Sequence, residues 1–172
     1  MKKLIILLSS IIIISNAIWS YVFYIVINKP SDTTIQVYNL NGTGVMWDVI
    51  NYQIIVSPSK ILRGHGGLIF KGDPNQIENS TYYKYELKEI NSNGSYETVY
   101  VKIASSEDGP VSILNNLNIG SITGEHAYDE QKKDKQNYEN TTITITWNDG
   151  KGEFHSETVD LEINSEITLN DD

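Results

Sequence analysis

Beyond about residue 34, apolar and polar residues alternate along the chain with a period of two, and helical periodicity is nearly absent. The clearest unit covers residues 82–103, in which residues 91–94 include the Asn-Gly pair that favours a tight hairpin turn. The strand before this turn places on one face Tyr83, Tyr85 and Leu87. The strand after it places on one face Val99, Val101 and Ile103. We therefore expect a β-hairpin whose core side is built from these two sets.

A second hairpin is expected near the carboxyl end, where residues 148–152 supply turn residues between two alternating segments. Its apolar face contains Ile143, Ile145 and Trp147 before the turn, and Val159, Leu161 and Ile163 after it. Further strands are expected over residues 35–40, 45–57, 67–71 and 111–113. This series of short strands predicts an all-β fold, either an antiparallel β-sandwich of immunoglobulin-like type or a small barrel.

The amino-terminal segment has a different character, because residues 4–27 contain no charged side chain. A helix of this length is about 36 Å long, enough to cross a hydrocarbon core of about 30 Å. Lys2 and Lys3 favour an inside amino terminus. We therefore expect a single-pass membrane anchor over residues 1–28, a polar linker over 29–34, and an extracytoplasmic β domain over 35–170.

A cleaved leader is the alternative for this segment. Residues 4–14 resemble a signal-peptide core, and Ser15 and Ala17 stand at small-residue positions before a possible cleavage site after Ala17. The apolar residues 18–27 would then begin a secreted protein, which makes an uncleaved anchor the favoured interpretation. A third possibility is that residues 18–27 form the first β-strand of the domain.

Composition excludes several classes of site and partner. The chain has no cysteine, so disulfides, thiolate metal sites and a cysteine nucleophile are excluded. The formal net charge is −9, and it is about −11 beyond Lys3. Such a surface repels phosphate backbones, so nucleic acid is not an expected partner. No cofactor is expected.

Several short motifs resemble those of small, mostly uncharacterised surface proteins of Bacillus-type Firmicutes. They are Gly42 with Trp47, Tyr52-x-Ile54, Ser57-Pro58, Gly64-x-Gly66-x-Leu68, Lys71-Gly72, Ile143-x-Ile145-x-Trp147 and Glu157-Thr158. The resemblance covers roughly residues 42–163 and implies one β-rich domain, with no catalytic residues to transfer. Many of these proteins are lipoproteins. Because this chain has no cysteine to carry a lipid, its anchor would be the helix.

The segment over residues 125–140 is polar and lacks an apolar face, so a long loop or one exposed helical turn is expected. On a helix His126 and Glu130 would lie four residues apart and share a zinc or calcium ion, with Glu125 or Asp129 assisting. Only one imidazole is present there, which favours a solvated acidic loop over a metal site.

Residues 63–67 form a glycine-rich stretch around Arg63 and His65 that offers a backbone anion nest. A strand follows it instead of a helix, so a turn with positive φ angles is the favoured interpretation. The last histidine, His155, is expected to be an exposed cross-strand residue. No sequence motif of a serine hydrolase or a zinc protease is present, although scattered histidines can still converge in space.

The return strand of the first hairpin carries Tyr96, Thr98 and Tyr100 opposite its valines. An exposed strip of this kind suits contact with a sugar or a protein, although ordinary cross-strand pairing of aromatic residues is the favoured explanation. We expect a non-enzymatic module that contacts an envelope protein, a wall polymer or a peptide. The alternatives are a domain that binds calcium or zinc through the acidic loop and, third, an extracytoplasmic hydrolase.

Overall fold

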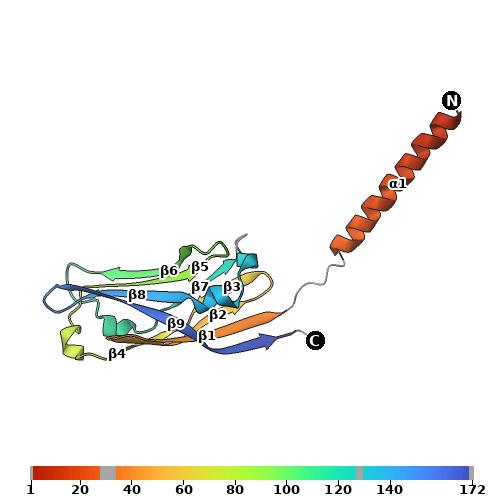
Figure 1. Cartoon of the computed structure of the whole chain (residues 1–172). Helices are drawn as coiled ribbons and strands as arrows, with labels where there is room; N and C mark the ends of the chain where they lie inside the picture. Colours follow the sequence, from red (N-terminus) through yellow and green to blue (C-terminus); the bar gives the residue numbers. More distant parts are fainter. Residues whose placement is uncertain (1, 28–33, 127–129, 171–172) are drawn as a thin grey trace. The chain divides into compact units, whose positions relative to one another are not determined.

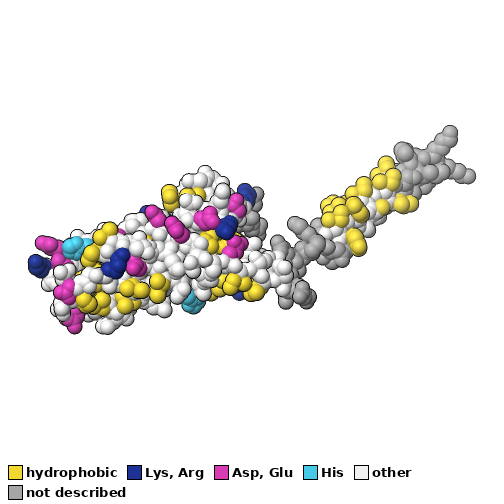
Figure 2. All heavy atoms as spheres, turned by 60° about the horizontal axis from the view of Figure 1, so that its bottom comes forward, with side chains coloured by type: hydrophobic (Ala, Val, Ile, Leu, Met, Phe, Trp, Pro, Cys, Tyr) yellow, Lys and Arg dark blue, Asp and Glu magenta, His cyan; other side chains and the backbone are white. Residues whose placement is uncertain are grey.

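The computed structural model describes the main chain of residues 2–27, 34–126 and 130–170, with the side chains of residues 2–10, 26, 27 and 131 left out. The chain forms two compact units, Met1–Asp32 and Thr33–Asp172. The first unit is the helix α1 (Lys2–Ile27), so residues 18–27 are helical and are not the first strand of the domain. Hydrophobic side chains along the described part of α1 are exposed (Figure 2). Within the described residues, no helix has both the length and the hydropathy of a membrane span.

The second unit is an antiparallel nine-stranded sheet that curls into a nearly closed barrel (Figure 1). The strands are β1 (Ile35–Thr43), β2 (Trp47–Val56), β3 (Lys60–Gly64), β4 (Gly67–Phe70), β5 (Tyr82–Ile90), β6 (Tyr96–Ser105), β7 (Ser121–Glu125), β8 (Thr141–Asn148) and β9 (Phe154–Leu169). Their order around the sheet is β6-β5-β8-β9-β1-β2-β3-β7, and β4 pairs with β2 beside β3. The predicted all-β fold is therefore confirmed, and its form is barrel-like.

The long strand β9 joins the two halves of the barrel. Its first half pairs with β8, and its second half pairs with β1. The core lies between these halves and is rich in aromatic rings: Trp47 is fully buried, packs on Phe70 and meets Trp147 edge to face at 5.6 Å between ring centroids. Trp147 is buried as its alternation predicts, together with Ile143 and Ile145 on the same strand.

Both predicted hairpins are present, but the inward face of β6 differs from the prediction. Val101 and Ile103, expected in the core, are 43% and 56% exposed. The cause is a β-bulge: Leu87 pairs with Tyr100 and Lys88 pairs with Thr98, which leaves Val99 without a partner across the ladder. Val99 itself packs against the core as predicted. The extra residue reverses the alternation beyond it, so Tyr100 and Ala104 pack against the core in place of Val101 and Ile103.

Other differences are confined to short segments. Residues 111–113 are not a strand, and the chain there enters the 3₁₀ helix η2 (Ile113–Asn116). Strands β3 and β7 were not expected. The glycine-rich stretch is a turn between β3 and β4, with positive φ angles of 141° at Gly64 and 59° at His65, as predicted. A further 3₁₀ helix, η1 (Pro74–Gln76), precedes β5.

The polar segment after β7 is more ordered and more buried than its sequence indicates. It contains the 3₁₀ helix η3 (Glu130–Lys132) and the short helix α2 (Lys135–Glu139). A capping box between Asp134 and Asn137 starts α2 by satisfying main-chain N–H groups of its first turn. Tyr138 is buried and packs on Tyr38 of β1. The expected exposed helical turn is therefore present as α2, but the burial of Tyr138 was not expected.

Candidate functional site

The barrel is interrupted between its two edge strands, β6 and β7. In the part of the chain that the structure describes, β6 pairs only with β5, and β7 pairs only with β3. Two side chains of β6 reach the segment that precedes β7: the Tyr100 hydroxyl donates to the Ile119 carbonyl at 2.9 Å and Lys102 Nζ donates to the Asn118 carbonyl at 3.0 Å. We call this interruption between β6 and β7 the seam.

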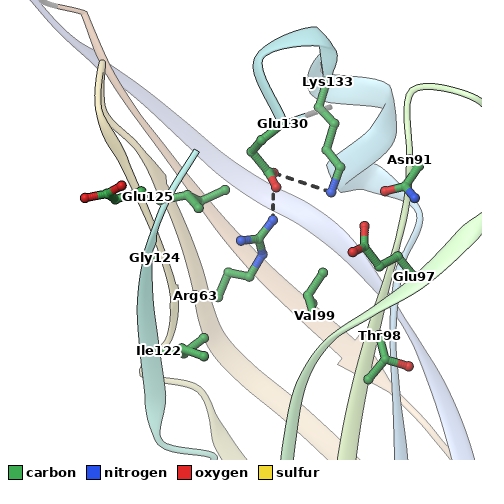
Figure 3. A pocket seen from close by; sticks show the side chains of 11 residues that line it. Arg63, Asn91, Glu97, Thr98, Val99, Ile122, Gly124, Glu125, Glu130 and Lys133 are labelled. Carbon is green, nitrogen blue, oxygen red and sulfur yellow. Dashed lines mark hydrogen bonds and ion pairs between the residues drawn. The ribbon is translucent and has the colours of Figure 1, made fainter. Parts of the chain in front are cut away.

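Beside Val99, the seam opens into a cavity of about 260 Å³ (Figure 3). Its apolar lining comes from Ile61, Val99 and Ile122. Its polar lining includes Arg63 from β3, Asn91 at the end of β5, Glu97 from β6, and Glu130 and Lys133 from the segment around η3. Strands from both halves of the barrel and the polar segment therefore meet at one place.

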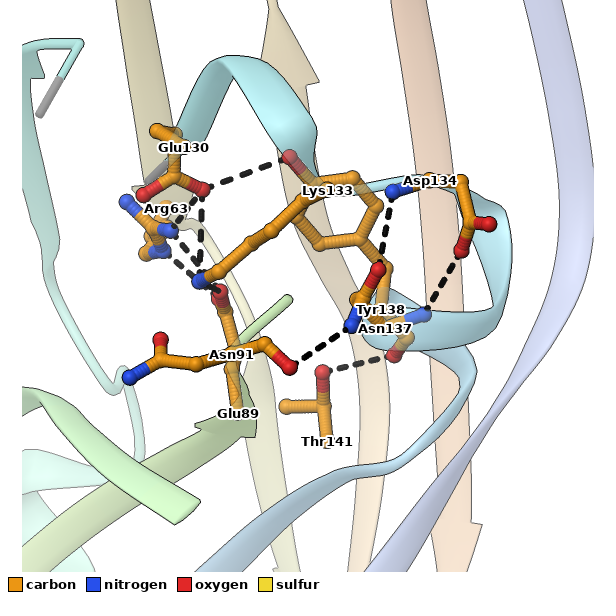
Figure 4. A network of polar contacts seen from close by, with 9 residues as sticks. All are labelled: Arg63, Glu89, Asn91, Glu130, Lys133, Asp134, Asn137, Tyr138 and Thr141. Carbon is orange, nitrogen blue, oxygen red and sulfur yellow. Dashed lines mark hydrogen bonds and ion pairs between the residues drawn. The ribbon is translucent and has the colours of Figure 1, made fainter. Parts of the chain in front are cut away.

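Behind this cavity lies a buried network of four charged side chains (Figure 4). Arg63 donates two hydrogen bonds to Glu89, from Nε to Oε1 at 2.6 Å and from Nη2 to Oε2 at 2.8 Å. Lys133 Nζ donates to Glu89 at 3.0 Å, and Arg63 Nη2 also donates to Glu130 at 2.7 Å. The Tyr138 hydroxyl donates to Glu130 at 3.3 Å. Two cations and two anions balance, so the network is neutral as a unit.

Burial makes this balance necessary. Glu89 is 0% exposed and Arg63 is 7% exposed, so each charge has lost most of its hydration. Burial by itself would raise the pKa of Glu89, but the hydrogen bonds and charges of Arg63 and Lys133 lower it below the usual value. Burial would lower the pKa of Arg63, and Glu89 raises it instead. Both groups are therefore ionised in the folded protein across the physiological range.

One polar atom that lines the cavity of the seam has no protein partner. The side-chain oxygen of Asn91 is buried and accepts no hydrogen bond from the described residues. Leaving a buried polar atom unpaired costs about 1–3 kcal/mol. The seam therefore presents an acceptor that a bound molecule would satisfy.

The three residues of the predicted aromatic strip are not brought together on one face. Tyr96 is 60% exposed and Thr98 is exposed, where its hydroxyl donates to Glu86. Tyr100 is half-buried and spans the seam instead of facing outward. The bulge at Val99 separates them. Residues 96 and 98 lie on one face of β6, and the extra residue places Tyr100 on the opposite face.

The four candidate metal ligands of the acidic segment are also not gathered into one site. Asp129 lies outside the described residues. Glu130 is engaged by Arg63 and Lys133, whereas the carboxylate of Glu125 is exposed and turned away from the cavity (Figure 3). His126 has a buried Nε2 atom without a partner. Among the described residues, none of these side chains belongs to a group arranged to hold a metal ion.

A different group has the spacing of metal ligands. The ligand atoms of Asp149, Glu153 and His155, on the hairpin between β8 and β9, lie within 4.8 Å of one another. Asp149 accepts hydrogen bonds from the main-chain N–H groups of Glu153 and Lys151, which lower the pKa of its carboxyl group. The His155 ring, exposed as predicted, stacks on Trp147. A cavity of about 360 Å³ lies beside Asp149 and His155.

Sequence reasoning missed the charged network, yet one signal for it was present. The alternation that buries Tyr83, Tyr85 and Leu87 continues to Glu89, which places a carboxylate on the core face of β5. A buried carboxylate requires a cationic partner. The partner was not evident, because Arg63 and Lys133 are distant in the chain and approach Glu89 only through the closing of the barrel.

The chain matches no family model, no curated protein and no solved structure.

Proposed function

We propose that this protein is a non-enzymatic binding module, tethered to the cell membrane by its amino-terminal helix, and that its extracytoplasmic β domain binds a partner at the seam. The proposed partner is an envelope protein, a wall polymer or a peptide. The observation that carries the proposal is the seam itself, where two strand edges without a partner strand among the described residues flank a cavity with a buried, unpartnered acceptor.

The tether is supported by the character of α1. Its 26 residues include the whole uncharged run from residue 4 to residue 27, and its side chains from Ile11 to Ile25 are exposed. Exposed apolar side chains on this scale favour a lipid or protein environment over water. The protein should therefore remain with membranes after a carbonate wash. Recovery of a soluble mature form that begins at Ile18 would instead establish cleavage after Ala17.

The binding site can be tested by filling the cavity. Gly124 lines it, and a Cβ added there would meet no atom within 4 Å, so Gly124→Phe places a ring in the cavity without a clash at its base. Gly109 is equally open and does not line the cavity, which makes Gly109→Phe a matched control.

A photo-cross-linking residue at Ile122 would report partners of the seam in intact cells. We expect a discrete adduct with the parent protein, loss of the adduct in Gly124→Phe, and retention in Gly109→Phe. A cross-linker at Thr158, an exposed residue of β9, should not give this adduct. An adduct that survives Gly124→Phe unchanged would show that the partner binds elsewhere.

Cation binding is the second candidate function, and the cluster of Asp149, Glu153 and His155 favours it. Imidazole and carboxylate ligands suit zinc. Zinc should then raise the melting temperature by binding the folded state alone, and His155→Gln should abolish the rise. His65→Gln, which alters an exposed histidine outside the cluster, is the control. An equal rise in both variants would exclude this site.

A further inference from the structure

We infer that the ligand of the seam is an extended polypeptide segment, which enters as an added strand between β6 and β7 and carries a lysine or arginine beside Glu97. This inference rests on the proposed binding function and names the chemistry of the partner.

The main chain of the two edges supports strand addition. Each edge strand leaves one row of N–H and C=O groups without a partner strand in the described part of the chain. Successive strands of this sheet are antiparallel, so β6 and β7 run in opposite directions. An inserted strand would therefore run antiparallel to one edge and parallel to the other. Neighbouring strands in a sheet lie about 4.8 Å apart, so an inserted strand needs this spacing on each side. The seam is wide near this point, because a whole tyrosine side chain, that of Tyr100, spans it.

The unpartnered oxygen in the cavity matches a peptide group. The side-chain oxygen of Asn91 requires a donor. A peptide main chain supplies one C=O acceptor and one N–H donor at each residue. The apolar side chains of Ile61, Val99 and Ile122 would contact the inward side chains of the same segment.

The charge of the seam favours a cationic segment. Glu89 and Glu130 are neutralised by Arg63 and Lys133. Glu97 is turned toward the cavity (Figure 3) and has no ion-pair partner among the described residues. The chain as a whole carries −9, so a cation is also attracted at long range. An anionic wall polymer would meet repulsion from Glu97, whereas a lysine or arginine would offset that charge.

The test uses the full chain in detergent micelles and three end-blocked, fluorescently labelled heptapeptides. The first is Thr-Val-Thr-Lys-Thr-Val-Thr, the second has glutamine in place of lysine, and the third is the lysine peptide with alternate main-chain nitrogens methylated. We expect the lysine peptide to bind about three- to fivefold more tightly than the glutamine peptide, the range of an exposed ion pair. Methylation should weaken binding at least about tenfold, because several main-chain hydrogen bonds are lost.

Variants of the protein separate the contribution of the Glu97 charge from that of the open cavity. Glu97→Gln should remove the preference for lysine and leave the glutamine peptide unaffected, whereas Glu107→Gln, an exposed acidic residue away from the seam, should keep the preference. Near 1 M salt, where the screening length is about 3 Å, the preference should also vanish. Gly124→Phe should abolish binding of both unmethylated peptides.

The outcomes distinguish this inference from the proposed function. If Gly124→Phe removes binding but lysine gives no advantage, or if methylation is tolerated, the inference is wrong and the seam remains the binding site. If Gly124→Phe leaves peptide binding unchanged, both proposals fail. If no peptide binds the parent protein at millimolar concentration, the inference fails, and cross-linking at Ile122 decides the function of the seam independently.

Discussion

The two sides of the barrel are built differently. On the closed side, β8 and β9 pair continuously from Thr141 opposite Leu161 to Asn148 opposite Phe154, and the core face is buried along β8 and at Val159 and Leu161 of β9. At the seam, the side chains of Tyr100 and Lys102 on β6 donate to main-chain carbonyl groups of the segment that precedes β7. The closed side is thus stabilised by main-chain pairing and apolar burial, whereas the seam is stabilised by a few polar contacts and a buried charged network. In the proposed function, the seam is the part of the barrel that binds a partner.

The largest effect should come from the aromatic core that the closed side supports. Trp47→Ala should lower the free energy of unfolding by about 3–5 kcal/mol, because a fully buried indole packed on Phe70 and Trp147 leaves a large cavity. Denaturant unfolding measures the loss. Trp19→Ala, at a 70% exposed position of α1, is the control and should leave the unfolding of the β domain unchanged. A loss below about 1 kcal/mol for Trp47→Ala would contradict the assigned core.

A slightly smaller effect is expected behind the seam. Glu89→Gln should cost about 3 kcal/mol at pH 7, because Arg63 and Lys133 are then left with Glu130 as the one carboxylate of the network. Glu97→Gln is a matched control, since Glu97 lies directly opposite Glu89 in the ladder and has no ion pair among the described residues. We expect the control to change stability by less than about 0.5 kcal/mol. Equal effects of the two variants would mean that the network does not stabilise the fold.

Acid should reduce the contribution of Glu89 in a defined direction. The folded-state pKa of Glu89 lies below its unfolded value, so its stabilisation is complete above the unfolded value of about 4.3. This stabilisation is lost as the pH falls through the lower folded value. The difference in stability between the parent protein and Glu89→Gln should therefore shrink from pH 5 toward pH 2. A difference that stays constant over this range would contradict ionised Glu89 in the folded state.

The sequence predicts the closed side better than the seam, for physical reasons. Strands β5 and β8 bury one face each, and that burial imposes the alternation from which Ile143, Ile145 and Trp147 are recognised as core. Strand β7 is exposed along its whole length, so its residues carry no such pattern. The bulge at Val99 depends on how β6 aligns with β5. The network around Glu89 depends on long-range contacts that local periodicity does not encode.

The smallest effect on stability is expected at the seam itself. Gly124→Phe adds a side chain to open space at a position without a positive φ angle, so stability should change by no more than about 0.5 kcal/mol. Thermal unfolding monitored by circular dichroism measures this difference, with Gly109→Phe as the matched comparison. A loss of several kcal/mol would show that the cavity is closed in solution, and the variant would then no longer test binding alone.

Amide hydrogen exchange tests the central claim, that the barrel is open between β6 and β7, most directly. In the free protein, the amides of β8 that pair with β5 and β9 should exchange slowly, and the seam-facing amides of β6 and β7 should exchange close to the rate of unprotected main chain. Saturation with the lysine heptapeptide should then protect these seam-facing amides and leave β8 unchanged. Strong protection of the β6 and β7 amides in the free protein would contradict the account, because it would mean that the two edges already pair with each other.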